Sequence, residues 1–193
     1  WDRGANTSVS TEQFYADYRR LANTPGMLAE DIGDAQAVLD GADEVVEATY
    51  EMPLLAHATL EPMNCIAQVD GDTCTIWSGT QYQSNDQEVI SRFLGIPQRT
   101  VTIHRPLMGG SFGRRSSKTA DYTVEAVEAA MGEAAPVQII WSREEDIRSG
   151  HYRPLFVHKL RGSVDETGMP EAWHQVAVGQ SLMQGTKHDP TYM

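Results

Sequence analysis

The sequence contains very little cysteine and no long hydrophobic run. Cys65 and Cys74 are the only cysteines among 193 residues, too few for a disulfide scaffold, and no second ligand pair accompanies them to complete a zinc site. We expect both to be structural thiols. No apolar stretch approaches the roughly 18 residues of a membrane span, and the N-terminus lacks the basic-then-apolar pattern of a signal peptide. The sequence therefore predicts no transmembrane segment in this chain.

Positive charge is also scarce. Lys and Arg number 15 against 27 Asp and Glu, which gives a formal net charge of −12. Because affinity for nucleic-acid phosphates needs an excess of basic residues, nucleic acid is excluded as a partner. Residues 92–118 depart from this average: they contain no acidic residue and six basic ones, namely Arg92, Arg99, Arg105, Arg114, Arg115 and Lys118. This run either holds an anion or forms a solvated face.

Strand and helix patterns mix along the chain without strict alternation. Strands are predicted at residues 44–52, 65–69, 73–77, 100–105, 136–141, 155–164 and 171–178. Helices are predicted from Ser10 to before Pro25, and over residues 34–39, 84–94 and 117–131. Asp70-Gly71-Asp72 predicts a hairpin, and Ser84-Asn85-Asp86 a helix cap. We therefore expect an α+β fold, a mixed sheet with helices packed on one face.

A glycine-rich turn lies between a predicted strand and a predicted helix. Its sequence, Met108-Gly109-Gly110-Ser111-Phe112-Gly113-Arg114-Arg115, lacks the spacing of a Walker loop. It also lacks the first glycine of a dinucleotide fingerprint, because Met108 stands in that place. Two interpretations remain open. The segment is a plain tight turn, or its backbone amides hold an anionic cofactor.

Several motifs, taken in order, resemble one enzyme family. They are Thr80-Gln81 before a helix, Gly95-Ile96-Pro97 at its end, Gly109-Gly110-Ser111-Phe112-Gly113, and Trp141-Ser142-Arg143-Glu144-Glu145-Asp146 after a strand. This series resembles molybdenum hydroxylases of the xanthine dehydrogenase and aldehyde oxidase family. The segment from Ala56 to Cys65, Gly113-Arg114-Arg115 and Trp1-Asp2-x-Gly4 look like its bacterial branch typified by the isoquinoline 1-oxidoreductase large (beta) subunit and related aldehyde dehydrogenases.

The resemblance implies a molybdopterin cofactor, with the cytosine dinucleotide as one form, and no metal ligand from this chain. Gln81 matches a glutamine that donates to an oxygen ligand of the metal, while Gly109, Gly110, Ser111, Phe112 and Gly113 match the turn beside it. Arg114 and Arg115 either neutralise a pyrophosphate or form salt bridges with the following helix. By this resemblance residues 44–193 are part of a molybdopterin-binding domain, and residues 1–43 an acidic helical or linker segment.

The implied reaction is hydroxylation with oxygen taken from water, assisted by a glutamate base. In the family that base lies beyond the position of Met193, so no catalytic residue is expected here. Glu61 is interpreted as a loop-ordering carboxylate paired with an arginine, with a place lining the site as the alternative. Ser116 stands where the purine-oxidising branch has an acid, so aldehydes or N-heteroaromatics such as isoquinoline are expected rather than purines.

The partners implied are the remainder of the catalytic subunit, a small two-iron two-sulfur subunit, a cytochrome c and a small-molecule substrate. The resemblance favours the periplasm, with the cytoplasm as the alternative compartment. The isolated fragment is expected to fold without cofactor and without activity. A different interpretation also stays open at this point, a non-catalytic binding or assembly module that uses the glycine-rich turn for an anionic partner.

Overall fold

The computed structural model describes residue 4 and residues 6–182, and the chain divides into two compact units. The first unit combines residues 1–55 with residues 153–193, and the second comprises residues 56–152. The first unit joins two stretches that are distant in sequence because strand β1 (Val46–Met52) pairs with β6 (Phe156–Val164), more than a hundred residues later. The domain boundary expected between residues 43 and 44 stays a prediction. The Trp1-Asp2 part of the family resemblance lies outside the described residues.

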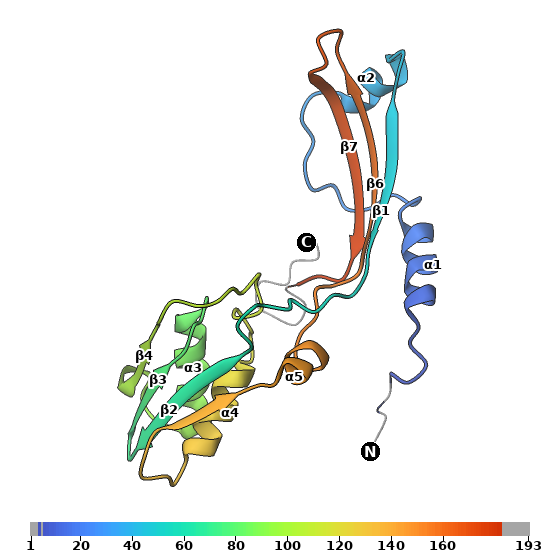
Figure 1. Cartoon of the computed structure of the whole chain (residues 1–193). Helices are drawn as coiled ribbons and strands as arrows, with labels where there is room; N and C mark the ends of the chain where they lie inside the picture. Colours follow the sequence, from blue (N-terminus) through green and yellow to red (C-terminus); the bar gives the residue numbers. More distant parts are fainter. Residues whose placement is uncertain (1–3, 5, 183–193) are drawn as a thin grey trace. The chain divides into compact units, whose positions relative to one another are not determined.

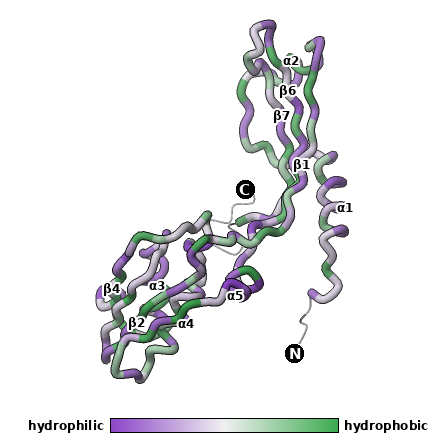
Figure 2. The backbone as a smooth tube through the Cα atoms, in the orientation of Figure 1, coloured by the Kyte–Doolittle hydropathy of each residue, from purple (hydrophilic) through white to green (hydrophobic). Residues whose placement is uncertain are grey.

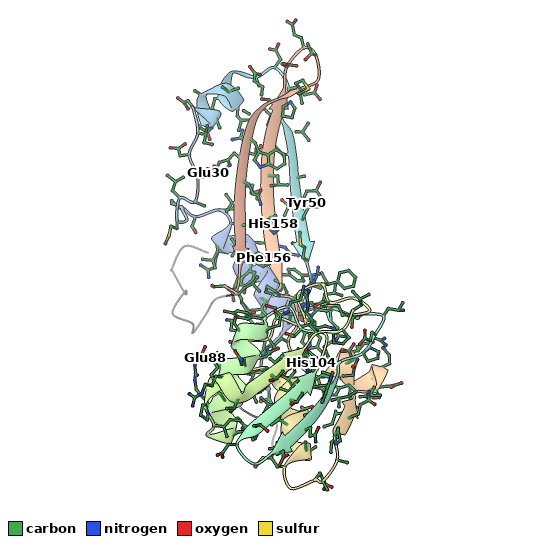
Figure 3. The ribbon with its side chains drawn as sticks, turned by 90° about the vertical axis from the view of Figure 1, so that its left-hand side faces the viewer. Glu30, Tyr50, Glu88, His104, Phe156 and His158 are labelled. Atoms are coloured by element: carbon green, nitrogen blue, oxygen red, sulfur yellow. The ribbon has the colours of Figure 1, made fainter. Side chains whose placement is uncertain are left out.

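The first unit is a three-stranded antiparallel sheet with two helices. The strands follow the order β1-β6-β7, and β7 is Pro170–Gly179. Figure 1 shows them side by side, and Figure 3 places Tyr50 and His158, paired across β1 and β6, within this sheet. Helix α1 is Thr11–Leu21, capped by Ser10, and α2 is Ala35–Gly41, capped by Asp34. The strands predicted at residues 155–164 and 171–178 are confirmed, and they pair antiparallel as β6 and β7.

The second unit contains a four-stranded mixed sheet in the order β4-β3-β2-β5. The strands are β2 (Asn64–Asp70), β3 (Thr73–Trp77), β4 (Val101–His104) and β5 (Val137–Ile140). Only β3 and β4 are parallel. The β2–β3 hairpin turns at Gly71, whose φ of +53° suits a residue without a side chain. The Asp70-Gly71-Asp72 signal therefore predicted this turn correctly.

Helices α3 (Gln83–Leu94) and α4 (Asp121–Ala130) contact each other and pack on this sheet (Figure 1). Between sheet and helices lies the core, formed by Met63, Cys65, Ala67, Cys74, Ile76, Ile90, Val101, Tyr122, Ala126, Val127, Ala130 and Trp141. Figure 2 shows hydrophobic stretches in β2 and α4. The expected fold class, a mixed sheet with helices on one face, is confirmed.

Two helix starts differ from the sequence-based expectation. Helix α4 begins at Asp121 rather than near residue 117, because Ala120 adopts a left-handed conformation with φ +50° that cannot continue a helix. Helix α3 has Tyr82 at its N-cap without a side-chain hydrogen bond, so the predicted cap is wrong. Asp86, one of the residues predicted to cap it, is instead buried.

Two short helices complete the second unit. A 3-10 turn, η1 (Gln98–Thr100), leads into β4, and helix α5 (Arg143–Arg148) follows β5. Ser142 and Glu145 form a reciprocal capping box at the start of α5. At the end of α3, Gly95 has a φ of +69°, as expected for a glycine that terminates a helix. None of the helices that the structure describes is long and apolar enough to cross a membrane.

The core of the second unit gives a test of its packing. Ile76 on β3 is fully buried, whereas Ile140 on β5 is 62% exposed. We expect Ile76→Ala to lower the free energy of unfolding by about 2–5 kcal/mol, because it leaves a cavity between sheet and helices. Ile140→Ala should cost under about 1 kcal/mol. Denaturant titration of both variants measures this difference, and equal losses would contradict the packing described.

Candidate functional site

Four connecting segments of the second unit meet at one end of its sheet. Strands β3 and β4 are parallel, so the segments that follow them, residues 78–82 and 105–116, leave the same end. Because β2 is antiparallel to both β3 and β5, the loop before β2 and the segment after β5 also lie there. Strand pairing alone therefore brings together motifs that lie as much as 80 residues apart.

The glycine-rich turn adopts a backbone that its sequence permits. Gly110 and Gly113 have φ values of +101° and +100°, which residues with a side chain rarely adopt. Phe112 shares this left-handed region with φ +54° and holds its ring 64% exposed. Gly109 is required for space, since a Cβ there would lie 2.6 Å from the Cβ of Glu61. Glycine thus serves two separate needs, conformation and close approach.

Gln81 is joined to this turn although it stands 30 residues earlier. Its side-chain oxygen accepts a hydrogen bond from the Ser111 hydroxyl. The Ser111 oxygen in turn accepts the Arg115 backbone N–H at 3.0 Å, and the Gln81 N–H donates to the Arg115 carbonyl at 3.0 Å. Ser111 occupies the side-chain oxygen of Gln81. The NH₂ group of this exposed carboxamide is then the end that can donate hydrogen bonds to a ligand.

Arg115 is the most deeply buried large side chain of the site. Its guanidinium donates to the carbonyl oxygens of Gly110 at 3.0 Å, Gly79 at 3.2 Å and Glu61 at 3.1 Å. These carbonyls belong to the turn, the segment after β3 and the loop before β2. Arg115 therefore fastens three segments to one another, and its charge is balanced by a Glu61 carboxylate oxygen 3.4 Å away.

Glu61 also connects the loop before β2 to the glycine-rich turn. Its carboxylate accepts the Gly109 backbone N–H and the Asn64 side-chain amide at 2.5 Å, while its own N–H donates to the Gly109 carbonyl at 3.1 Å. Partial burial opposes ionisation, but the hydrogen bonds from Asn64 and Gly109 and the charge of Arg115 outweigh it and lower the pKa of Glu61. The interpretation of Glu61 as a loop-ordering carboxylate paired with an arginine is confirmed.

Arg114 is also buried, and it connects the turn to helix α4. Its guanidinium forms two hydrogen bonds with Asp121, at 2.7 and 3.2 Å, and lies over the rings of Tyr122 and Trp141. A Cβ at Gly150 would lie 2.4 Å from Arg114 Nη2, so glycine is needed there for space. Of the two interpretations, the salt bridge to the following helix is confirmed for Arg114, in a buried rather than a surface position.

Of the two alternatives left open for these arginines, a pyrophosphate partner or a salt bridge, the contacts within the protein support the second. Arg114 is 4% exposed and Arg115 is 1% exposed, and both guanidinium groups are directed at protein partners. Burial of an arginine requires that its charge and donors be satisfied within the protein. Their role in this unit is to hold the turn, which leaves the backbone of the turn and Gln81 as the parts open to a ligand.

Two contributions to the site were not anticipated from the sequence. Arg143, within the Trp-Ser-Arg-Glu-Glu-Asp motif, donates to the carbonyls of Thr59 at 2.6 Å and Leu60 at 2.7 Å. Asp86 accepts a 2.5 Å hydrogen bond from Thr80, the residue directly before Gln81. A signal for Asp86 existed, because Asp86 stands four residues before the core residue Ile90 on the same face of the helix.

The cysteines play no visible part in this arrangement. Both are free thiols in the core, where burial raises the pKa of Cys65 to about 12 and that of Cys74 to about 11. They are therefore protonated and unreactive at neutral pH, as expected for structural thiols. Among the described residues, no group of three or more His, Cys, Asp and Glu side chains is placed to hold a metal ion.

Comparison with known proteins places this arrangement in context. Residues 21–181 match the family described as molybdopterin cofactor-binding domain. The isoquinoline 1-oxidoreductase beta subunit of Brevundimonas diminuta is 31% identical over 139 residues, covering 70% of this chain and 17% of the relative. The aldehyde oxidoreductase molybdenum-binding subunit PaoC of Escherichia coli K12 is 27% identical over 173 residues, covering 89% of this chain and 24% of the relative.

Solved structures agree on the fold. Quinoline 2-oxidoreductase from Pseudomonas putida 86 superposes with a TM-score of 0.59 at 17% identity, covering 74% of this chain and 18% of that one. The aldehyde oxidoreductase of Desulfovibrio gigas gives 0.59 at 21% identity, covering 76% and 16%. This chain thus spans about a quarter or less of the length of each relative and structure described.

The burial of Arg115 gives a test of the site's construction. We expect Arg115→Met to lower the free energy of unfolding by about 3 kcal/mol or more, because it leaves buried carbonyls without donors and Glu61 without its cation. Arg92→Met is the matched control, since Arg92 pairs with Glu88 on the exposed face of α3 and should cost under about 1 kcal/mol. Chemical unfolding of both variants decides, and equal effects would exclude a fastening role for Arg115.

Proposed function

Because this chain belongs to the family of molybdopterin cofactor-binding domains, we propose that it is part of the catalytic subunit of a molybdenum hydroxylase. The proposed substrates are aldehydes or N-heteroaromatic compounds, as the names of the relatives suggest. The chain spans 17% and 24% of two such relatives, so the activity belongs to a longer protein. We further propose that the isolated chain folds but carries neither cofactor nor activity.

The observation that carries this proposal is the coupling of Gln81 to the glycine-rich turn through Ser111. It fixes an exposed amide donor beside the backbone of the glycine-rich turn. A Cβ at Gly113 would meet no protein atom closer than 3.8 Å, so the room above this glycine is left open by the protein itself. The residues present therefore fit a large anionic cofactor held by backbone amides.

When bound, the molybdenum cofactor supplies the oxidising chemistry, which accepts two electrons from the substrate carbon as oxygen from water is added. The contribution of this chain is to bind and orient that group. Gln81 donates a hydrogen bond from its NH₂ group to an oxygen of the cofactor, and Phe112 and Gly113 present the backbone that the cofactor approaches. Neither arginine of the turn contacts it, because both are buried against the protein.

Glu61 is not the general base in this proposal. Its carboxylate is ion-paired with Arg115, and it accepts hydrogen bonds from Asn64 and Gly109. These contacts lower the pKa of Glu61, and a carboxylate held in this way is a weak proton acceptor. We propose that the base is a glutamate in the part of the subunit that follows this chain.

The proposal also covers the class of substrate, the electron-accepting partners and the cellular compartment. Ser116 is exposed after the turn and carries no charge, which favours uncharged aldehydes or N-heteroaromatics over purines. Electrons taken from the substrate require an acceptor, and we propose a small two-iron two-sulfur subunit, followed by a cytochrome c. The periplasm is the proposed compartment.

Substitution at Gly113 tests the cofactor cradle. We expect Gly113→Ala in the full-length subunit to lower the molybdenum and pterin content of the purified protein several-fold, because the added methyl group occupies the space of the cofactor. Gly132→Ala is a close control: its φ of +84° imposes similar backbone strain, about 1 kcal/mol, and its Cβ would meet nothing within 4 Å.

Metal analysis and pterin fluorescence measure the outcome, and thermal unfolding checks that both variants lose similar stability. Equal cofactor content in the two variants would show that the cofactor does not approach this turn. That result would favour a non-catalytic binding module instead.

A further inference from the structure

The buried carboxylate of Asp86 contacts the segment that carries Gln81. Asp86 stands in the first turn of helix α3 and is 3% exposed, and its partner Thr80 is fully buried. An acidic residue in a first helical turn interacts favourably with the helix dipole even at an exposed position. The helix dipole therefore does not explain why Asp86 is buried, because burial of a carboxylate carries a desolvation cost that an exposed position avoids.

The Thr80 hydroxyl connects Asp86 to the backbone on both sides of Gln81. It donates to a carboxylate oxygen of Asp86 at 2.5 Å and accepts the backbone N–H of Tyr82 at 3.1 Å. The same hydroxyl lies 3.4 Å from the Arg115 carbonyl, which is the acceptor of the Gln81 N–H. The peptide groups before and after the Gln81 side chain are thus held by one small network.

We propose that Asp86 is a positioning residue for Gln81, acting through the Thr80 hydroxyl to fix the backbone from which the Gln81 carboxamide reaches the glycine-rich turn. This inference rests on the proposed function, because it assigns Asp86 a role toward the amide that meets the cofactor. It goes beyond that function in naming a residue that contacts neither cofactor nor substrate.

The argument depends on the single proton of the Thr80 hydroxyl. Two acceptors compete for it, the Asp86 carboxylate and the Arg115 carbonyl. An ionised carboxylate is the stronger acceptor, so it takes the proton and fixes the Thr80 hydroxyl, whose oxygen accepts the Tyr82 N–H. If Asp86 becomes neutral, its hold on the Thr80 hydroxyl weakens, and so does the anchor of the backbone around Gln81.

The charge of Asp86 is sensitive to pH because of its surroundings. Burial raises the pKa of Asp86 to about 6, the nearby charge of Asp121 adds to this, and hydrogen bonds from Thr80 and Asn85 oppose it. The other titratable or charged groups that face this network are Tyr122 of α4, Cys65 of β2 and Arg115 of the turn. Asp86 is therefore ionised above about pH 6 and neutral below it.

Two variants of the full-length subunit separate the roles of acceptor and charge. Asp86→Leu removes the acceptor but keeps a side chain branched at Cγ, whereas Asp86→Asn keeps an acceptor that cannot ionise. Glu88→Gln is the control, since Glu88 is exposed on the same helix and points away from the core (Figure 3). Hydrogen exchange of the peptide covering residues 79–82 is measured by mass spectrometry, together with kcat and KM from pH 5 to 9.

We expect Asp86→Leu to speed exchange at residues 81–82 by about 10-fold. It should lower kcat by about 10- to 100-fold while KM stays within about 3-fold. Asp86→Asn, which is neutral at every pH, should resemble the wild type below about pH 6, with exchange rates and kcat between those of the wild type near neutral pH and those of Asp86→Leu. The wild-type fall in kcat below about pH 6 should be absent from the Asn variant, and Glu88→Gln should resemble the wild type throughout.

A loaded Asp86→Leu enzyme with unchanged exchange, or with kcat within about 2-fold of wild type, would overturn the inference. A wild-type subunit that purifies without molybdopterin would instead defeat the proposed function. In that case the exchange measurement alone decides whether Asp86 orders the Gln81 segment.

Discussion

The whole site depends on the burial of one guanidinium group. Irregular segments carry backbone carbonyls that no strand or helix satisfies, and burying such groups without donors is costly. Arg115 supplies several donors in a fixed planar arrangement and reaches the loop before β2, the segment after β3 and the turn itself. A lysine offers only a point charge and has no such geometry. The ordering of three loops at one end of the sheet therefore follows from this one side chain and its partner Glu61.

Because both arginines of the turn contact protein partners, the proposed cofactor would be held by the backbone of the turn and by Gln81. A cofactor that brings its own sulfur ligands for the metal needs orientation and hydrogen bonds from the protein rather than coordination. The described residues offer a glycine-rich turn beside an amide donor, which can supply such contacts. The basic run at residues 92–118 stands out in an otherwise acidic chain. Two of its six basic residues, Arg114 and Arg115, are buried and pair with acidic side chains of the protein.

Backbone strain is concentrated around this end of the second unit. Among the residues that the structure describes, three other than glycine have a positive φ: Phe112 lies within the turn, and Ala58 and Ala120 lie in the segments that surround it. Each costs on the order of 1 kcal/mol and persists only where the surrounding contacts enforce it. The buried pairs of Arg114 with Asp121 and of Thr80 with Asp86 provide such contacts. Buried polar contacts thus hold the segments at this end of the unit, beside the hydrophobic core.

The sequence alone determined the features whose causes are local. The hairpin at Gly71, the end of α3 at Gly95 and the mixed character of the sheet follow from turn chemistry and residue periodicity, and the order of the motifs indicated the family. Only the tertiary structure decided the burial of Arg114, Arg115 and Asp86, the later start of α4 and the pairing of β1 with β6. These features depend on partners that are distant in sequence or on the cost of burying charge, and apart from the helical spacing between Asp86 and Ile90, local patterns carry no information about either.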